Sequence, residues 1–306
     1  GGLRLLRLDP GTGKKLSEHV LDGSVPETED DLQTLVRGLD MPVALPDILS
    51  SDGQYVYMRS QRFDQEGRRL AIDAPTGNVR DQQGEGAHLF SPTGFLDDAD
   101  WHRSYWVYGL RWASGAGGYF KAGRFAPAGR ILAFDDTTVY GFRREPDYFR
   151  WTTPIERYLY ACDKAPKIER YRPPHKKKGF RAMLKPEVGI ETRWTQPFPL
   201  HVRAMVLSDG ALFVAGPHDV VDETESLRTF AKPQTQAKLS EQSRVLKGES
   251  GGLLCAVSPD DGGKLAEYRL AELPVWDGLA AAKGRLYLAT QGGRVICWKA
   301  STPSGL

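Results

Sequence analysis

The segment DDADWHRSYWVY at residues 97–108 holds the densest group of side chains that could bind a ligand. Tryptophan and tyrosine rings stack on sugars and other planar groups, and a neighbouring arginine can bind hydroxyls or a carboxylate. Alternatively, the aromatic side chains pack between strands and the polar ones lie in a turn. The ligand-binding hypothesis assigns seven residues: Asp98, Asp100, Trp101, His102, Arg103, Tyr105 and Trp106.

The geometry of a β-strand limits this hypothesis. Successive side chains of a strand point to opposite faces, so His102 and Arg103 would face apart within one strand. Both can line one concavity only if the strand begins near Ser104 and they lie in the loop before it. A strand that already runs at Trp101 would indicate packing instead of a binding site.

A weaker group lies in HVRAMVLSDGALFVAGPHDVVD, which begins with His201. His218, Asp219 and Asp222 offer one imidazole and two carboxylates, a weak signal for a metal site because turn and capping roles explain the aspartates as well. We expect no metal site. The sequence contains no G-x-S-x-G, H-E-x-x-H or P-loop motif, so no catalytic residue is assigned.

Short alternating strands surround these groups. A tight turn followed by alternating apolar residues recurs at residues 51–60, 135–144, 208–217 and 282–291. In the block 252–298, apolar runs alternate with Gly, Asp and Pro, which is typical of antiparallel strands joined by tight turns. Seven side chains of this block are predicted to be buried between sheets: Leu253, Val257, Leu279, Leu286, Leu288, Val295 and Ile296.

A strand–turn–strand element also recurs, as LLRLDPGTGKKLSEHVL at 5–21, RLAIDAPTGNV at 69–79 and LLCAVSPDDGGKLAEYRL at 253–270. The turn of the first copy contains Asp9, Thr12, Gly13 and Lys14; the third copy has Ser258 in place of the aspartate. This element resembles the repeat of the PQQ-like (pyrroloquinoline-quinone-like) bacterial β-propeller family. The resemblance implies an all-β propeller of four-stranded antiparallel blades, with about four to five blades in this chain.

The recognisable strands begin with the last two of one blade and end with the first three of another. We therefore expect the C-terminal part of a propeller of about seven or eight blades, completed by N-terminal blades or by a companion chain. The alternative is an intact small propeller with degenerate blades at 109–127 and 152–194. In either case we expect a single domain over residues 1–306, which is partial in the first case, because strand signals run from end to end.

The resemblance does not imply a quinone cofactor. Quinoproteins of this fold hold PQQ with Ca²⁺, a catalytic Asp and often an adjacent Cys pair, whereas Cys162, Cys255 and Cys297 are far apart in this chain. Where the blade-docking tryptophan is expected, the chain has residues 266–268, AEY. We expect the non-quinoprotein branch, with no cofactor. Cys255 and Cys297 lie in apolar runs and are expected to be free and apolar in character, the alternative being a disulfide between neighbouring strands.

The function implied is an extracytoplasmic binding or scaffold module that recognises a protein or a glycan, in the periplasm or outside the cell. The alternative is an enzyme that acts on a carbohydrate or an alcohol at the propeller mouth. A net charge of +2 over 306 residues gives no indication of nucleic-acid binding. Apolar runs of about 18 residues are missing, so no membrane span is expected.

Three inserts interrupt the strand pattern, at about 24–42, 164–188 and 222–250. The first contains a predicted helix at 28–39. The third contains another at 226–246, which Pro233 should restrict to the part after Gln234. The middle insert is rich in lysine and arginine, and it is interpreted as a solvated linker or as a docking arm for an anionic partner.

Overall fold

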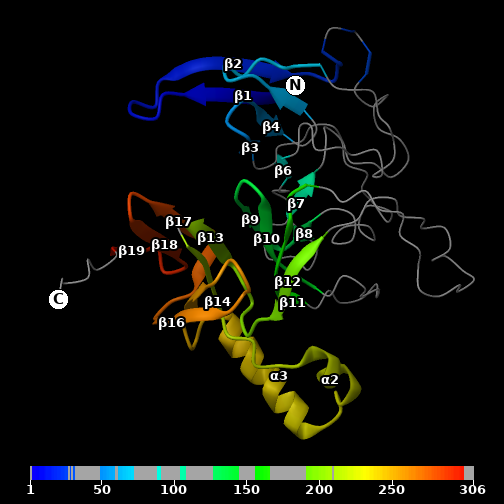
Figure 1. Cartoon of the computed structure of the whole chain (residues 1–306), viewed down its shortest axis with the longest axis vertical. Coiled ribbons are helices and arrows are strands. Elements are labelled where there is room, and N and C mark those ends of the chain that lie inside the picture. Colours follow the sequence, from blue (N-terminus) through cyan, green and yellow to red (C-terminus); the bar gives the residue numbers. More distant parts are fainter. Residues whose placement is uncertain are drawn as a thin grey trace, which may run out of the picture. The chain divides into compact units, whose positions relative to one another are not determined.

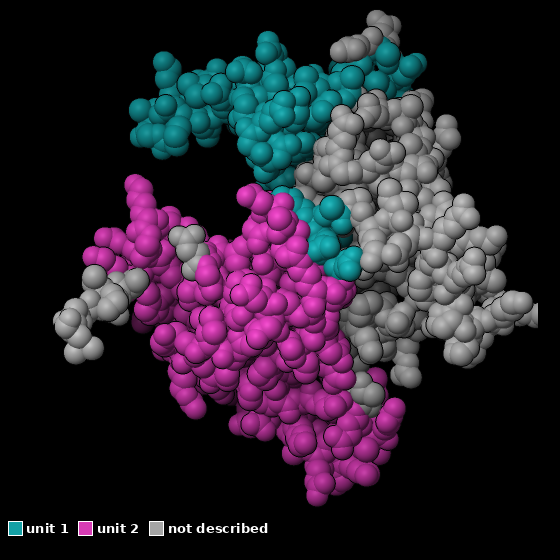
Figure 2. Space-filling model, viewed as in Figure 1, with its two compact units in different colours: residues 1–128, 163–191 teal, residues 129–162, 192–306 magenta. Residues whose placement is uncertain are grey.

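The computed structural model describes residues 2–26, 28, 30–31, 49–58, 61–71, 88–90, 104–107, 127–144, 156–165, 191–208 and 210–299. These ranges contain mostly β-strands, with two helices, as the all-β prediction requires (Figure 1). The chain divides into two compact units, residues 1–128 with 163–191 and residues 129–162 with 192–306 (Figure 2).

Unit 1 contains short antiparallel sheets. The first sheet pairs β1 (Leu3–Leu8) with β2 (Lys15–Leu21), and the second has the order β3 (Ser50–Ser51), β4 (Val56–Met58), β5 (Gln61–Phe63). A third sheet has the order β6 (His88–Phe90), β7 (Ser104–Val107), β8 (Ala128–Gly129). The first strands β3 and β6 are neighbours.

Unit 2 contains three larger sheets, in which each strand lies beside the next one in the sequence. The first sheet has the order β9 (Ile131–Phe134), β10 (Thr138–Arg144), β11 (Glu156–Asp163), β12 (Thr192–Pro197). The second has β13 (Ala204–Ser208), β14 (Ala211–Gly216), β15 (Gly252–Val257), β16 (Lys264–Leu270). The third has β17 (Pro274–Ala282), β18 (Arg285–Thr290), β19 (Val295–Lys299). The first strand of the middle sheet, β13, lies next to both β9 and β17.

Successive sheets of unit 2 pack face to face. Because strand side chains alternate, Val214 and Cys255 of the middle sheet join a core with Ile131 and Phe142 of the first sheet. The next residues along the same two strands point the other way and join a second core with β17 and β18. At about 25 cal/mol per Å² of apolar surface removed from water, this burial is the main stabilising term of the unit.

The burial prediction for residues 252–298 is mostly confirmed. Four of the seven side chains are buried, namely Val257, Leu279, Leu286 and Leu288, and Leu253 and Ile296 are half-buried. Val295 is 71% exposed, so its prediction is wrong. The reason is strand alternation: Val295 and Ile296 point to opposite faces of β19, and only the Ile296 face is turned toward the core. The three cysteines are free, with Cys297 exposed on the face of Val295.

The hairpins β1–β2 and β15–β16 are copies of one structure, as the sequence repeat predicts. In both, a register shift precedes the turn, at Arg7/Leu8 and at Ala256/Val257. The backbone N–H of Ser258 donates to the carbonyl of Gly263, as that of Asp9 does to Lys14. Each turn has a glycine with positive φ, Gly13 at 69° and Gly262 at 76°. The copy at 69–79 lies outside the described residues from position 72 onward.

Another repeated feature was missed in the sequence. Asp52 and Asp135 precede β4 and β10, and each accepts two backbone hydrogen bonds of its own turn with Oδ1. With Oδ2, each accepts a hydrogen bond from the tyrosine five residues later, 2.6 Å from Tyr57 and 3.0 Å from Tyr140. The shared pattern Asp-x-x-x-Val-Tyr could have predicted this cap, because aspartate is the usual partner of turn N–H groups.

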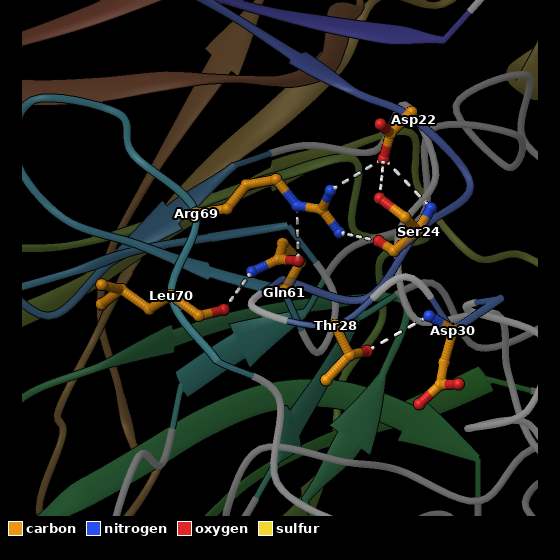
Figure 3. A network of polar contacts seen from close by, with 7 residues as sticks. All are labelled: Asp22, Ser24, Thr28, Asp30, Gln61, Arg69 and Leu70. Carbon is orange, nitrogen blue, oxygen red and sulfur yellow. Dashed lines mark hydrogen bonds and ion pairs between the residues drawn. The ribbon is translucent and has the colours of Figure 1, made fainter.

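A network of polar contacts ties the end of β2 to β5 within unit 1 (Figure 3). The guanidinium of Arg69 is largely buried, and it donates to Asp22 at 3.3 Å, to the Ser24 carbonyl at 2.7 Å and to Gln61 at 3.2 Å. Gln61 is fully buried, and it donates in turn to the carbonyl of Leu70. A buried charge with several hydrogen bonds favours one arrangement of these strands over alternatives.

Helices α2 (Glu223–Arg228) and α3 (Pro233–Leu246) occupy the predicted insert at 222–250. Pro233 begins α3, so the prediction that the helix starts after Gln234 is wrong. The first helical position needs no N–H donor and suits the fixed φ of proline. Most of the predicted helix at 28–39 and of the basic insert at 164–188 lies outside the described residues.

Trp194 of β12 joins the first sheet of unit 2 to the second. Its indole N–H donates to the carbonyl of Pro259 at 2.8 Å, and the ring covers the turn at Gly262. Trp194 thus docks the first sheet on the turn of the second. Tyr268, in the segment 266–268, is 56% exposed.

We predict that Gly262→Ala destabilises unit 2 by about 2–4 kcal/mol in urea unfolding, because left-handed strain adds to a steric overlap. A Cβ at Gly262 would lie 2.7 Å from the ring of Trp194. The control is Gly284→Ala, where φ is also positive but the space is open, so only about 1–2 kcal/mol should be lost. Equal losses in the two variants would contradict the docking role of Trp194.

Candidate functional site

The ligand-binding group predicted from the sequence falls largely outside the described residues. Asp98, Asp100, Trp101, His102 and Arg103 are not among them. Tyr105 and Trp106 belong to β7, which covers Ser104–Val107. The hypothesis therefore stays a prediction.

Charged side chains gather at one end of the middle sheet of unit 2. The segment 198–203 leads into β13, and the segment 217–222 follows β14, so both leave the same end of these antiparallel strands. Backbone hydrogen bonds hold the two segments together, from His201 N–H to the Pro217 carbonyl and from Asp219 N–H to the Pro199 carbonyl, both at 2.9 Å. This end of the sheet therefore has an ordered backbone.

His201 and Asp219 form a mostly buried pair on these two segments. The imidazole Nε2 lies 3.4 Å from Asp219 Oδ1, and the two side chains are 14% and 12% exposed. The sequence pattern pointed instead to His218, which is exposed. Among the described residues, no group of three or more His, Cys, Asp or Glu side chains is arranged to hold a metal ion.

Glu223 lies at the edge of this pair, at the start of α2. Burial and the neighbouring carboxylates of Asp219 and Asp222 raise the pKa of Glu223 to about 7, against the opposing charges of His201 and Arg157. Asp222 caps α2 by accepting from the N–H of Glu225, and its other oxygen lies 3.5 Å from Arg157 Nη1. A carboxyl with a pKa near neutrality can bind or release a proton at physiological pH.

Helix α3 fixes the segment that carries these groups. Gln242 is buried, and its side-chain oxygen accepts from the Val220 N–H at 2.7 Å. Its amide nitrogen donates to the carbonyl of His218 at 3.1 Å. The helical insert at 222–250 thus positions the segment that bears Asp219, which no sequence pattern indicated.

A second polar position lies in β17, the first strand of the third sheet. The pairing of β17 with β18 is irregular between Pro274 and Leu279, and Asp277 sits in this bulge with a positive φ of 53°. Its N–H donates to the carbonyl of Arg203 at 2.8 Å, which anchors the bulge beside the start of β13. Bulges often redirect a side chain near functional sites.

The carboxyl of Asp277 reaches solvent, yet burial raises its pKa to about 6. No described residue donates a hydrogen bond to this carboxyl, and burial is the only cause of the pKa shift. The group is therefore available as an acceptor for a ligand.

Trp276 directly precedes Asp277 in β17 and contacts an arginine of another strand. Trp276 is half-buried against the core, and the guanidinium of Arg130 lies 5.5 Å from its ring centroid. Arg130 directly precedes β9, and Arg203 directly precedes β13. Strand β13 lies next to both β9 and β17. Four residues therefore lie at or near the starts of neighbouring strands, namely Arg130, Arg203, Trp276 and Asp277.

A scan against protein-family models and a search of curated proteins found no match to this chain. Among the described helices, none is long and apolar enough to cross a membrane.

We predict that Glu223→Gln stabilises the protein at pH 8 by about 1–3 kcal/mol and changes little at pH 5, as measured by urea unfolding. The pKa of Glu223 is raised in the folded protein, so the protonated side chain stabilises the fold at pH values below its ordinary pKa of 4.5. This stabilisation is lost as the pH rises through about 7. Glutamine keeps the neutral form at every pH. The control Glu225→Gln, at an exposed position of the same helix, should have no such pH dependence. An equal effect of Glu223→Gln at both pH values would refute the assignment.

Proposed function

We propose that this chain belongs to a β-propeller built from PQQ-like repeats, and that it acts as an extracytoplasmic binding or scaffold module. The main support is the contact of the first strands β9, β13 and β17, because the innermost strands of propeller blades meet in this way. Each sheet continues outward from its first strand in sequence order. The packing of Trp194 on the turn of the next sheet supports a radial repeat as well.

The binding surface in this proposal is the end of unit 2 described above. Segments 198–203 and 217–222 and the bulge of β17 lie on a rigid scaffold of sheets, which is the usual location of binding residues. The partner is a glycan or a protein, and no quinone cofactor is part of the proposal.

An enzyme that acts on a carbohydrate or alcohol is the second candidate. The observation in its favour is the His201–Asp219 pair beside Glu223, whose pKa of about 7 suits general acid–base chemistry. We favour binding over catalysis for two reasons. The His201–Asp219 pair is mostly buried, so it is poorly placed to meet a substrate. The accessible carboxyl of Asp277 has no imidazole partner among the described residues with which it could share a proton.

The test is to apply the chain to an array of bacterial and plant glycans and of envelope-protein peptides, and to analyse each retained ligand by mass spectrometry. We predict that at least one ligand is retained and recovered chemically unchanged. Conversion of the ligand, abolished by His201→Asn, would establish the enzyme instead. Retention of no ligand would contradict the binding role. The matched control is His218→Asn, which changes an exposed imidazole outside the buried pair.

A further inference from the structure

We propose that the β1–β2 hairpin and the third sheet of unit 2 carry the two halves of a docking interface, through which this chain assembles head to tail with a second copy of itself. The inference rests on the stacked repeat of the proposed function and goes beyond its ligand-binding role. Equivalent faces of the repeat carry it, because the chain itself shows what covers each kind of face.

The β1–β2 hairpin packs on the sheet that follows it in the same way as its copy, β15–β16. Leu5 and Leu21 are buried in a core with β4 and β5. The residues at the same distances from the turn in the copy are Leu254 and Leu270, and they are buried in a core with β17 and β18. One face of the hairpin is therefore covered as the repeat requires.

The opposite faces of the two hairpins differ. In β15, Cys255 and Val257 are 1% and 0% exposed, because they pack in one core with the first sheet of unit 2. Their equivalents in β1 are Leu6 and Leu8, which are 49% and 52% exposed. Both leucines are apolar, as a face beneath another sheet requires. The β1–β2 hairpin thus exposes the face on which its copy receives the preceding sheet.

The turns of the two hairpins show the same difference. In the copy, the Pro259 carbonyl accepts from the indole of Trp194, and a Cβ at Gly262 would lie 2.7 Å from that ring. In the β1–β2 hairpin, Pro10 is the equivalent of Pro259 and is exposed. A Cβ at the equivalent Gly13 would have no other atom within 4 Å. The turn of the first hairpin is therefore open where that of the copy is docked.

The third sheet of unit 2 exposes the complementary face. In the middle sheet, Ala215 pairs with Leu254, and both are buried against the third sheet. At the equivalent place in the third sheet, Ala289 pairs with Val295. Leu254 is 3% exposed, whereas Val295 is 71% exposed. The whole equivalent face of β18 and β19 consists of Tyr287, Ala289, Val295 and Cys297. It keeps apolar residues where the middle sheet is covered by the sheet that follows it.

The presence of both free faces on one chain indicates the occupant. Neighbouring sheets of unit 2 meet through the following face of one and the preceding face of the next. The third sheet has an exposed following face, the hairpin has an exposed preceding face, and a second copy supplies each with its counterpart. Exposed apolar faces of this kind mark protein interfaces. Because two different surfaces meet, the contact is heterologous, and the copies either close a ring or continue into a larger assembly.

The experiment measures self-association of the whole chain by sedimentation velocity over a wide range of concentrations. We expect the wild-type chain to associate as its concentration rises. Leu8→Lys and Val295→Lys should each weaken this association about tenfold or more, because each places a charge against an apolar face. The control Leu265→Lys changes a leucine of β16 that is 59% exposed and lies outside both free faces, so it should leave association unchanged.

A mixture of the two variants tests the head-to-tail arrangement. Leu8→Lys leaves the third-sheet face intact, and Val295→Lys leaves the hairpin face intact. Together they have one complete contact, so we expect a one-to-one pair and no larger assembly. Formation of this pair would also show that both variants are folded. A mixture that associates no better than either variant alone, beside a wild-type chain that does associate, would overturn the arrangement.

Other outcomes assign the faces differently and overturn the second copy as occupant. If the wild-type chain stays monomeric and either substitution lowers its urea midpoint, the two faces belong to one chain. If it stays monomeric and neither substitution changes the midpoint, the faces are left to a sheet of a different protein. Association that only Leu8→Lys weakens would indicate a symmetric contact of two hairpins. Association that neither weakens would lie elsewhere on the molecule. In each case the ligand-binding role depends only on the array.

Discussion

The strands β14 and β15 of the middle sheet of unit 2 are apolar on both faces, and the packing of this unit follows from that. Val214 and Cys255 pair across β14 and β15 and point to the first sheet, while Ala215 and Leu254 pair beside them and point to the third. A sheet with two apolar faces is stable only between two others. Stacking of sheets is therefore required by the alternation of side chains along single strands.

Stacking has a direct consequence for the location of polar groups. When sheets pack face to face with their first strands adjacent, the segments that enter these strands meet at one end. His201 and Arg203 lie on the segment that enters β13, and Asp277 lies near the start of β17. Side chains from distant parts of the sequence are brought together there, and none of them contributes to the apolar cores. Keeping these polar side chains partly out of water is unfavourable for folding, and the free energy gained in the buried apolar cores offsets it.

The acidic residues of this protein show how one side-chain type takes different roles. At Asp52 and Asp135 the carboxylate completes a turn and holds a tyrosine hydroxyl. At Glu223 the carboxyl is surrounded by other charges, and its protonation depends on them. At Asp277 no described residue donates a hydrogen bond to it, and burial alone raises its pKa. These roles follow from position relative to the backbone and not from residue type, so composition could not distinguish them.

Local patterns along the chain were enough to predict most strands, the turns and their repetition. Alternation placed Leu279 and Leu288 in the core, and the turn pattern identified Ser258 as the equivalent of Asp9, because both signals are local. Which distant residues meet could not be predicted and became clear from the folded chain. It paired His201 with Asp219, set Trp194 on the turn at Gly262, and left Val295 on an exposed face. The physical reason is that each of these outcomes depends on which neighbouring element covers a face, and a single strand contains no information about its neighbour.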